Sequence, residues 1–291
     1  METQLIRFAP AKLNLHLAVG EIEQDGLHAI QSLFVTTDLT DTIRVTAKTS
    51  KQFSITVTGL EEYCKPGSDT ITKAATLYHE ATSLSYSLSV HCDKRIPTQA
   101  GLGGGSSDAA AMLLILQELA GEHKLCDGDL FALAHRVGSD VSFFVSEAKA
   151  AIVEGRGDTV TSIEGRLLPC LLVFPKELSV STKEAYGALD AMENRQIQFV
   201  EPQEIERRFK DSIPNWGKTF YNDFTRVLIE LPFFRELERV TTGFGGYQGL
   251  SGSGPSWYFV VETEDDLDQI EKKIITHFGE QCVTYRLTMC S

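Results

Sequence analysis

The sequence predicts a fold that mixes strands and helices, arranged as one large or two modest domains. Its 291 residues exceed the size of an average single domain. Hydrophobic residues make up 42% and charged residues 23%, which is ordinary for a globular enzyme. Strand-like alternation of polar and apolar residues dominates the first 60 residues, whereas helical segments and short strands mix over the rest.

Charge and cysteine usage narrow the class of protein. The net charge of -13 argues against nucleic acid or an anionic membrane as the main partner. An anionic substrate would need a local site built from Lys, Arg and backbone N–H groups. The six cysteines form no C-x-x-C pair, which indicates thiols in a reducing compartment. No targeting segment or membrane-length apolar run is visible, so a cytoplasmic location is expected.

The N-terminal elements are predicted mainly from alternation. From Lys12 to Leu17, Lys12, Asn14 and His16 share one face of a strand and three leucines share the other. Residues 41–58 are interpreted as a pair of strands around a polar bend. A helix is predicted from Ser68 to Thr82, capped by Ser68 or Asp69.

The segment from residue 84 to residue 137 is the most informative. A strand is predicted over 84–91, and Pro97 ends the extended stretch that follows it. After a run of glycines, the residues Ser106-Ser107-Asp108 offer N-cap chemistry. Residues 109–120 are apolar nearly all round, which predicts a buried helix that ends at Gly121. A second helix is predicted over 128–137.

A domain boundary is predicted at about residues 162–169, because a new run of strands and helices begins at Cys170. This gives two domains, residues 1–165 and 166–291. The elements predicted around and beyond the boundary are strands at 150–153, 170–174, 257–261 and 282–288, and helices near 183–192, 201–210, 225–231 and 264–277.

Four glycines stand directly before the predicted buried helix, in the segment Gly101 to Ser107. Glycine lets the backbone come close to a ligand, and a helix N-terminus supplies free N–H groups, so this segment favours a phosphate site. The alternative is a simple turn before a core helix. No Lys-Ser/Thr follows the glycines as in a Walker A loop, and Ser106 occupies the third glycine of the dinucleotide fingerprint. Protein-kinase signatures are absent from the sequence.

A second glycine cluster, Gly249 to Ser256, leads into a predicted strand and by itself indicates only a turn. Together, however, three segments resemble the motifs of the GHMP kinases, the superfamily of galactokinase, homoserine kinase and mevalonate kinase. They are PAKLNL from Pro10, the stretch from Pro97 to Ser107, and LSGSGP from Leu250. The sequence is most similar to the 4-diphosphocytidyl-2-C-methyl-D-erythritol kinase family, through DGLHAIQSLF from Asp25, DKRIP before the glycines and GSDVSFFV from Gly138.

The resemblance implies a two-domain α+β GHMP kinase fold. Its N-terminal ATP-binding domain would resemble ribosomal protein S5 domain 2, and its C-terminal substrate-binding domain would be ferredoxin-like. It also implies transfer of the γ-phosphoryl group of ATP to the 2-hydroxyl of the cytidine-linked methylerythritol, with Mg²⁺ neutralising the phosphates. The partner is thus a small molecule, and either a monomer or a homodimer is compatible with the sequence.

The resemblance further implies site residues. Lys12 and Asp140 become the catalytic pair, and Asn14, His28, Thr182 and Tyr186 become substrate contacts. The ATP site would comprise Lys94, Pro97, Thr98, Gln99, Ala100, Gly101, Leu102, Gly103, Gly104, Gly105, Ser106 and Ser107. The sequence identifies no metal ligand.

Each catalytic assignment has a structural alternative: Asp140 as a helix cap, Lys12 as a solvated lysine, Asn14 as a backbone-bonding amide. The chain also departs from the family at Leu27, where the family usually has Tyr as one wall of the cytosine site. The rival functions are another GHMP kinase, of homoserine, mevalonate or shikimate type, and an inactive GHMP-like binding protein. Neither Lys12, Asp140 nor the loop glycines are lost, which disfavours the inactive protein.

Overall fold

The computed structural model describes residues 2–24, 26–192 and 195–290, which form two compact units. The first unit consists of residues 2–11, 39–98 and 103–148, and the second of the remaining described residues. Strands β1 (Glu2–Ile22) and β2 (His28–Thr49) contribute to both units. The units therefore alternate along the chain, and the functional division near residue 165 stays a prediction.

The strands of the first unit are joined in an order that the sequence did not predict. The second half of β2 pairs antiparallel with β4 (Tyr86–Asp93), from Thr42 opposite Asp93 to Thr49 opposite Tyr86. Strand β3 (Ser54–Thr58) pairs parallel with β4. Both strands predicted within residues 41–58 are present, but they do not pair with each other, because β4 lies between β2 and β3 and takes the hydrogen bonds of both.

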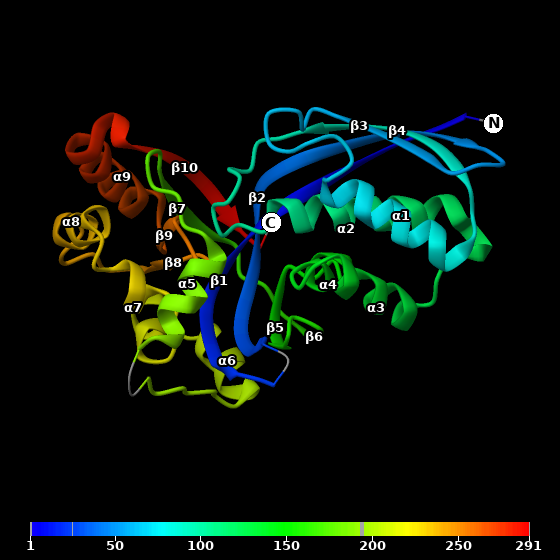
Figure 1. Cartoon of the computed structure of the whole chain (residues 1–291). Helices are drawn as coiled ribbons and strands as arrows, with labels where there is room; N and C mark the ends of the chain where they lie inside the picture. Colours follow the sequence, from blue (N-terminus) through cyan, green and yellow to red (C-terminus); the bar gives the residue numbers. More distant parts are fainter. Residues whose placement is uncertain (1, 25, 193–194, 291) are drawn as a thin grey trace. The chain divides into compact units, whose positions relative to one another are not determined.

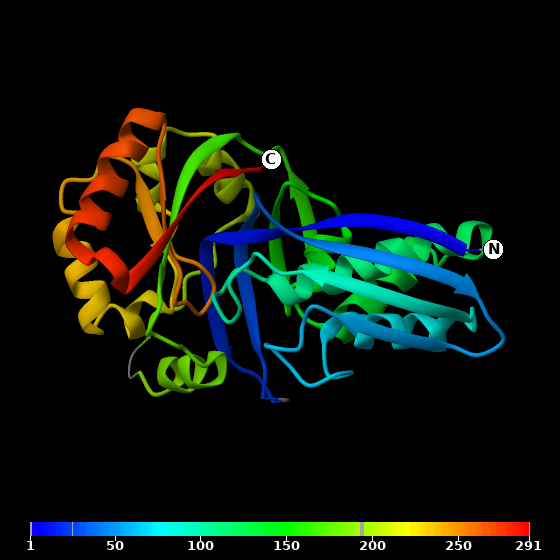
Figure 2. The same ribbon diagram turned by 90° about the horizontal axis from the view of Figure 1, so that it is seen from above.

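Four helices complete the first unit: α1 (Thr70–Thr82), α2 (Gly104–Ala120), α3 (Asp127–Val137) and the short α4 (Val141–Val145), with a 3₁₀ turn at Gly121–His123. Figures 1 and 2 show α1 and α2 side by side along one face of strands β3 and β4. Asp69 caps α1 as predicted, since its Oδ1 accepts the N–H of Thr72 at 2.7 Å. The apolar α2 is buried along most of its length, which confirms the predicted core helix.

Helix α2 begins earlier than its cap residues suggested. Its N-cap is Gly103, in the left-handed region at φ 69°, and no side chain caps it. The first helical hydrogen bond runs from the N–H of Ser107 to the carbonyl of Gly103, at 2.9 Å. Ser106 and Ser107 thus lie within the first turn, so the predicted Ser-Ser-Asp cap is wrong. Glycine adopts the left-handed conformation without strain, which lets the N-cap lie at Gly103, three residues before Ser106.

The second unit is built on antiparallel strands. Strand β7 (Leu168–Pro175) lies between β10 (Cys282–Met289) and β9 (Trp257–Val260), and β8 (Tyr247–Leu250) pairs with β9. Strand β10 also meets β2 where Met289 faces Thr37. The first half of β2 pairs with β5 (Ala150–Gly155), which pairs with β6 (Thr159–Ile163). The sequence analysis did not predict β8, because this strand runs into the start of the second glycine cluster.

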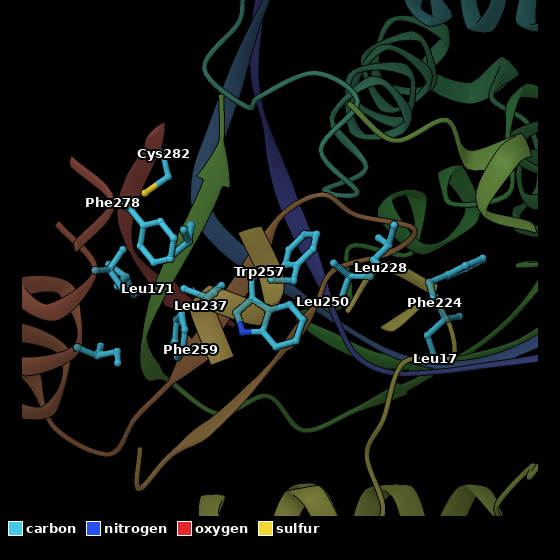
Figure 3. Close-up of a cluster of buried hydrophobic side chains, with 14 of the residues drawn as sticks. Leu17, Leu171, Phe224, Leu228, Leu237, Leu250, Trp257, Phe259, Phe278 and Cys282 are labelled. Atoms are coloured by element: carbon cyan, nitrogen blue, oxygen red, sulfur yellow. The ribbon is translucent and has the colours of Figure 1, made fainter. Parts of the chain in front are cut away.

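Helices cover these strands: α5 (Thr182–Asp190), α6 (Pro202–Phe209), α7 (Thr225–Leu228), α8 (Pro232–Val240) and α9 (Glu264–Phe278), with 3₁₀ turns at Ile213–Lys218 and Gly279–Gln281. The single helix predicted over 225–231 stops at Leu228, and α8 starts at Pro232, a residue suited to a first helical position. Figure 3 shows the core beneath them, where Trp257 and Phe259 of β9 pack with Leu237 and Phe278. Among the described residues, no helix has the length and apolarity needed to cross a membrane.

Candidate active site

The predicted catalytic lysine lies in a buried polar cluster on β1. Lys12 and Asn14 are only 3% and 2% exposed, and the Lys12 ammonium donates to Asn14 Oδ1 at 2.5 Å. Asn14 Nδ2 donates to the hydroxyl of Ser32 on β2 at 3.0 Å. The Lys12 Nζ also lies 4.6 Å from the centre of the Phe34 ring. The alternative of a solvated Lys12 is therefore wrong, and Ser32 is a member of this cluster that the sequence did not indicate.

The backbone of β1 is fixed around this cluster. Tyr258 and Tyr247 donate their hydroxyls to the carbonyls of Asn14 and Leu15, both at 2.9 Å. Burial raises the pKa of both tyrosines above the usual range, so both phenols stay protonated and act as donors. The N–H of Lys12 donates to the carbonyl of Leu102 at 3.0 Å, which joins β1 to residues 99–102 of the glycine loop.

His16 continues the same strand and is fully buried. Its Nδ1 accepts the N–H of Tyr221 at 3.4 Å, and its ring meets that of Tyr221 edge-on at 4.8 Å. Within the described part of the chain, Nε2 has no hydrogen-bond partner. Burial lowers the pKa of His16 to about 4, so the imidazole is neutral at physiological pH.

The two glycine clusters meet backbone to backbone within the second unit. Gly101 has φ +75°, and a Cβ on it would lie 2.0 Å from the carbonyl oxygen of Ser251. The Ser251 hydroxyl donates to the Gly101 carbonyl at 2.9 Å. A Cβ on Gly252 would lie 3.0 Å from the same carbonyl. The second cluster is thus more than an isolated turn, because it supports the start of the first.

The rest of the first glycine segment opens helix α2 in the first unit. A Cβ on Gly104 would lie 3.1 Å from Ile96 and 3.2 Å from Lys94 Nζ. The carbonyl of Gly105 accepts the Thr70 hydroxyl at 2.6 Å. Since no side chain caps α2, its first N–H groups remain directed at the N-terminal end, where an anion is stabilised.

Lys94 beside this helix start is held in an ion triad. Its Nζ lies 2.5 Å from Asp41 Oδ2 and 2.9 Å from Asp108 Oδ2, and all three side chains are buried. Burial alone would lower the pKa of Lys94, but Asp108 and Asp41 outweigh it and raise that pKa. Burial raises the pKa of Asp108, and Lys94 opposes the rise. The charge of Lys94 is therefore already balanced by two carboxylates.

Asp140, the predicted base, is the N-cap residue of α4, but its side chain makes no capping hydrogen bond. Its backbone is in the right-handed helical region, at φ -81° and ψ -11°. A carboxylate that caps a helix accepts an N–H from the first turn. The structure therefore gives no support to the alternative that Asp140 serves as a cap.

The predicted nucleoside contacts gather in the second unit. The rings of His28 and Tyr186 lie 5.0 Å apart, and Tyr186 meets Phe224 edge-on. His28 Nδ1 lies 3.0 Å from the carbonyl oxygen of Gly20. Leu27, the departure from the family pattern, is 51% exposed.

Thr182 begins α5, and its hydroxyl lies 2.9 Å from that of Ser253 in the second glycine cluster. Asn14, His28, Thr182 and Tyr186 thus belong, with Lys12 and residues 99–102, to the second unit, whereas Lys94, Pro97, Thr98, residues 103–107 and Asp140 belong to the first. Asp25 of the predicted substrate motif lies outside the described residues.

The fold is that of a GHMP kinase. The family model described as the GHMP kinases N terminal domain matches residues 69–148. A solved structure of a 4-(cytidine 5'-diphospho)-2C-methyl-D-erythritol kinase superposes with a TM-score of 0.78 and 28% identity, covering 98% of this chain and 99% of its own. Homoserine kinase from Cytophaga hutchinsonii, at 17% identity and a TM-score of 0.71, shares the fold over 99% of this chain and 94% of its own.

Sequence relatives narrow the class. The 4-diphosphocytidyl-2-C-methyl-D-erythritol kinase of Bacteroides fragilis is 32% identical over 276 residues, which cover 92% of this chain and 96% of the relative. The corresponding enzyme of a Nocardioides species is 33% identical and covers 88% of each chain. The chain therefore belongs to the 4-diphosphocytidyl-2-C-methyl-D-erythritol kinase family, and the predicted resemblance is confirmed.

Proposed function

We propose that this protein transfers the γ-phosphoryl group of ATP to the 2-hydroxyl of 4-diphosphocytidyl-2-C-methyl-D-erythritol, in the non-mevalonate route to isoprenoid precursors. Membership of the kinase family supports the reaction class. The observation that carries the proposal is the buried Lys12–Asn14 pair on β1, which places a cation and an amide on one strand face.

Phosphoryl transfer to an alcohol needs positioning, neutralisation of charge and a proton acceptor. We assign proton acceptance to Asp140, the carboxylate to which the family resemblance through GSDVSFFV gives this role. Lys12 would stabilise the charge that develops on the acceptor oxygen or the transferring phosphoryl group. Asn14 orients Lys12 through their 2.5 Å hydrogen bond and offers its amide to the acceptor alcohol.

ATP is the donor in this family, and we assign its phosphates to the N-terminus of α2 and the glycines before it. Lys94 balances Asp41 and Asp108 and so contributes by shaping the helix start. Mg²⁺ usually binds through nucleotide phosphates with one or two protein ligands. In the described chain, no group of three or more His, Cys, Asp or Glu residues is arranged to hold a metal. The family resemblance implies that Mg²⁺ neutralises the ATP phosphates.

The assay that tests this function couples ADP release to a panel of alcohols: the cytidine-linked methylerythritol, homoserine, mevalonate and shikimate. We expect turnover with the cytidine-linked alcohol alone. Equal turnover with an alcohol that lacks cytidine would replace the acceptor assignment with that of another GHMP kinase. Failure of every alcohol would favour the inactive binding protein. A cytoplasmic location, and a monomer or homodimer, remain predictions.

Asp140→Asn tests the base within the same assay. The change keeps the shape and removes the proton acceptor, so kcat should fall by about 10²- to 10⁴-fold while ATP binding persists. Near-normal turnover of the folded variant would remove Asp140 from the mechanism.

Gly104→Val tests the phosphate site. The added side chain would meet Ile96 and Lys94 at the start of α2. ATP affinity measured by calorimetry should fall much more than the melting temperature without nucleotide. Unchanged ATP affinity would contradict the phosphate assignment.

A further inference from the structure

Asn222 uses its whole side chain to hold the second glycine cluster. Its Nδ2 donates to the carbonyls of Leu250 and Gly252, both at 2.8 Å, and its Oδ1 accepts the N–H of Phe224 at 2.9 Å. The residue is buried. The two carbonyls flank Ser251, so the amide fixes the backbone on both sides of that residue.

Ser251 in turn fixes Gly101 at the start of the ATP loop. Its hydroxyl donates to the Gly101 carbonyl, and its own carbonyl oxygen would lie 2.0 Å from a Cβ on Gly101, too close for any side chain there. Asn222 therefore fixes the start of the nucleotide loop without touching it, because Ser251 lies between Asn222 and Gly101.

The next residue, Asp223, holds the backbone of β1 at Leu17 and Val19. It is fully buried, its N–H donates to the Leu17 carbonyl at 2.9 Å, and its Oδ2 accepts the N–H of Val19 at 2.8 Å. The same Oδ2 lies 3.6 Å from the guanidinium of Arg195.

Arg195 links Asp223 to His28, the predicted nucleoside contact. It donates to the carbonyls of Val19 and Gly20 at 2.5 and 2.7 Å. The Gly20 carbonyl is also the atom against which His28 Nδ1 lies, at 3.0 Å. The carboxylate of Asp223 keeps Arg195 in place, and Arg195 fixes the carbonyl that orients the His28 ring.

We propose that Asn222 and Asp223 are positioning residues for two different substrates: Asn222 sets the ATP loop through Ser251 and Gly101, and Asp223 sets the acceptor's nucleoside contact through Arg195, Gly20 and His28. The proposal rests on the function proposed above. The two neighbouring side chains should therefore affect different substrates. Replacing Asn222 should weaken ATP binding, and replacing Asp223 should raise the acceptor KM.

The first arm measures binding of a non-hydrolysable ATP analogue with Mg²⁺ by calorimetry, without acceptor. Asn222→Ala leaves two buried carbonyls without their donors, so the analogue's Kd should rise about 5- to 50-fold. Asn215→Ala is the matched control, because the side-chain partners of Asn215 among the described residues are Asp211, Ser212 and Lys218, near the surface. Unchanged affinity in the folded Asn222 variant would overturn this half of the proposal.

The second arm measures steady-state kinetics. Asp223→Asn keeps the shape but removes the charge that holds Arg195, so the acceptor KM should rise about 2- to 15-fold while the ATP KM stays near wild type. Arg195→Gln should reproduce this effect, and the double variant should be no worse than either single one. Asp211→Asn is the matched control, since Asp211 pairs with Arg208 at 2.8 Å away from this network.

If Asn222→Ala does not fold, Ser251→Ala tests the contact between the second glycine cluster and Gly101 with a smaller change. If Asp223→Asn does not fold, Arg195→Gln tests the contact between Arg195 and the Gly20 carbonyl. A rise in both Michaelis constants for each variant would show a general structural role and overturn the proposal. Should wild type not use the cytidine-linked alcohol, the proposed function and the Asp223 half fail together, whereas calorimetry still decides the Asn222 half.

Discussion

Two ends of the site in the second unit are built differently. At the reacting end, Lys12, Asn14 and Ser32 are buried and linked by side-chain hydrogen bonds of 2.5 and 3.0 Å. At the nucleoside end, the rings of His28 and Tyr186 lie 5.0 Å apart, His28 Nδ1 lies 3.0 Å from the carbonyl oxygen of Gly20, and Leu27 is exposed. We therefore expect substitutions in the linked polar cluster to affect the chemical step, and a substitution at the exposed Leu27 to affect recognition of the acceptor. The first end should govern kcat and the second KM.

Lys12→Met should have the largest effect. The thioether keeps most of the buried volume but removes the cation beside Asn14, so kcat should fall about 10²- to 10³-fold with the ATP KM near wild type. Lys51→Met, on an exposed bend, is the control. Steady-state kinetics in which Lys12→Met raised the acceptor KM and left kcat unchanged would contradict the assignment of the chemical step to this end of the site.

His16, farther along the same strand, should make stability depend on pH. Its folded pKa of about 4 lies below the usual value of 6.5, so the unfolded chain binds more protons between these pH values. Stability contributed by the neutral ring is complete above pH 6.5 and falls by about 3 kcal/mol as pH drops to 4. Urea unfolding of His16→Gln across this range should give a flatter profile, whereas the exposed His123→Gln should retain the wild-type slope. Parallel profiles for wild type and His16→Gln would contradict a buried neutral His16.

The smallest effect is expected at the nucleoside end. Leu27→Tyr adds an aromatic wall beside His28, and such a contact is worth about 0.5–1.5 kcal/mol, so the acceptor KM should fall about 2- to 13-fold. Tyr186→Ala should raise it by a similar factor. Neither variant should change the ATP KM. Leu167→Tyr, at another exposed leucine of this unit, controls for an added surface aromatic. Kinetics in which both variants altered kcat would show that the two ends are not distinct.

Local signals predicted local structure well. The cap at Asp69 and the apolar run of α2 each lie within one element, and both predictions are confirmed. The pairing of β3 with β4 depends on a strand that arrives 28 residues or more later in the chain, so the alternation of residues 41–58 could not reveal it. The start of α2 was misplaced because serine cap chemistry was visible, whereas the left-handed backbone at Gly103 was not.

In the candidate site, too, the sequence predicted contacts between residues that are close in the chain and not those between distant residues. Alternation placed Lys12 and Asn14 on one face, and their side chains do meet. The partners of Lys94, by contrast, are 53 and 14 residues away, and no spacing rule links them. The roles of Asn222 and Asp223 could not be predicted from the sequence, because they depend on the backbone of β1 and of the second glycine cluster.

The alternation of the two units along the chain has a consequence for synthesis. All segments of the first unit have left the ribosome once residue 148 has emerged, so its strands and helices can assemble while the chain is still growing. The second unit must wait for β10, whose pairing with β7 spans Cys282 to Met289. Until then, residues 12–38 remain without the strand that meets Thr37, and a nascent chain would hold Lys12 in an unfinished sheet. The hydroxyls of Tyr247 and Tyr258, which hold the β1 backbone beside Lys12, likewise reach β1 only after every segment of the first unit has emerged.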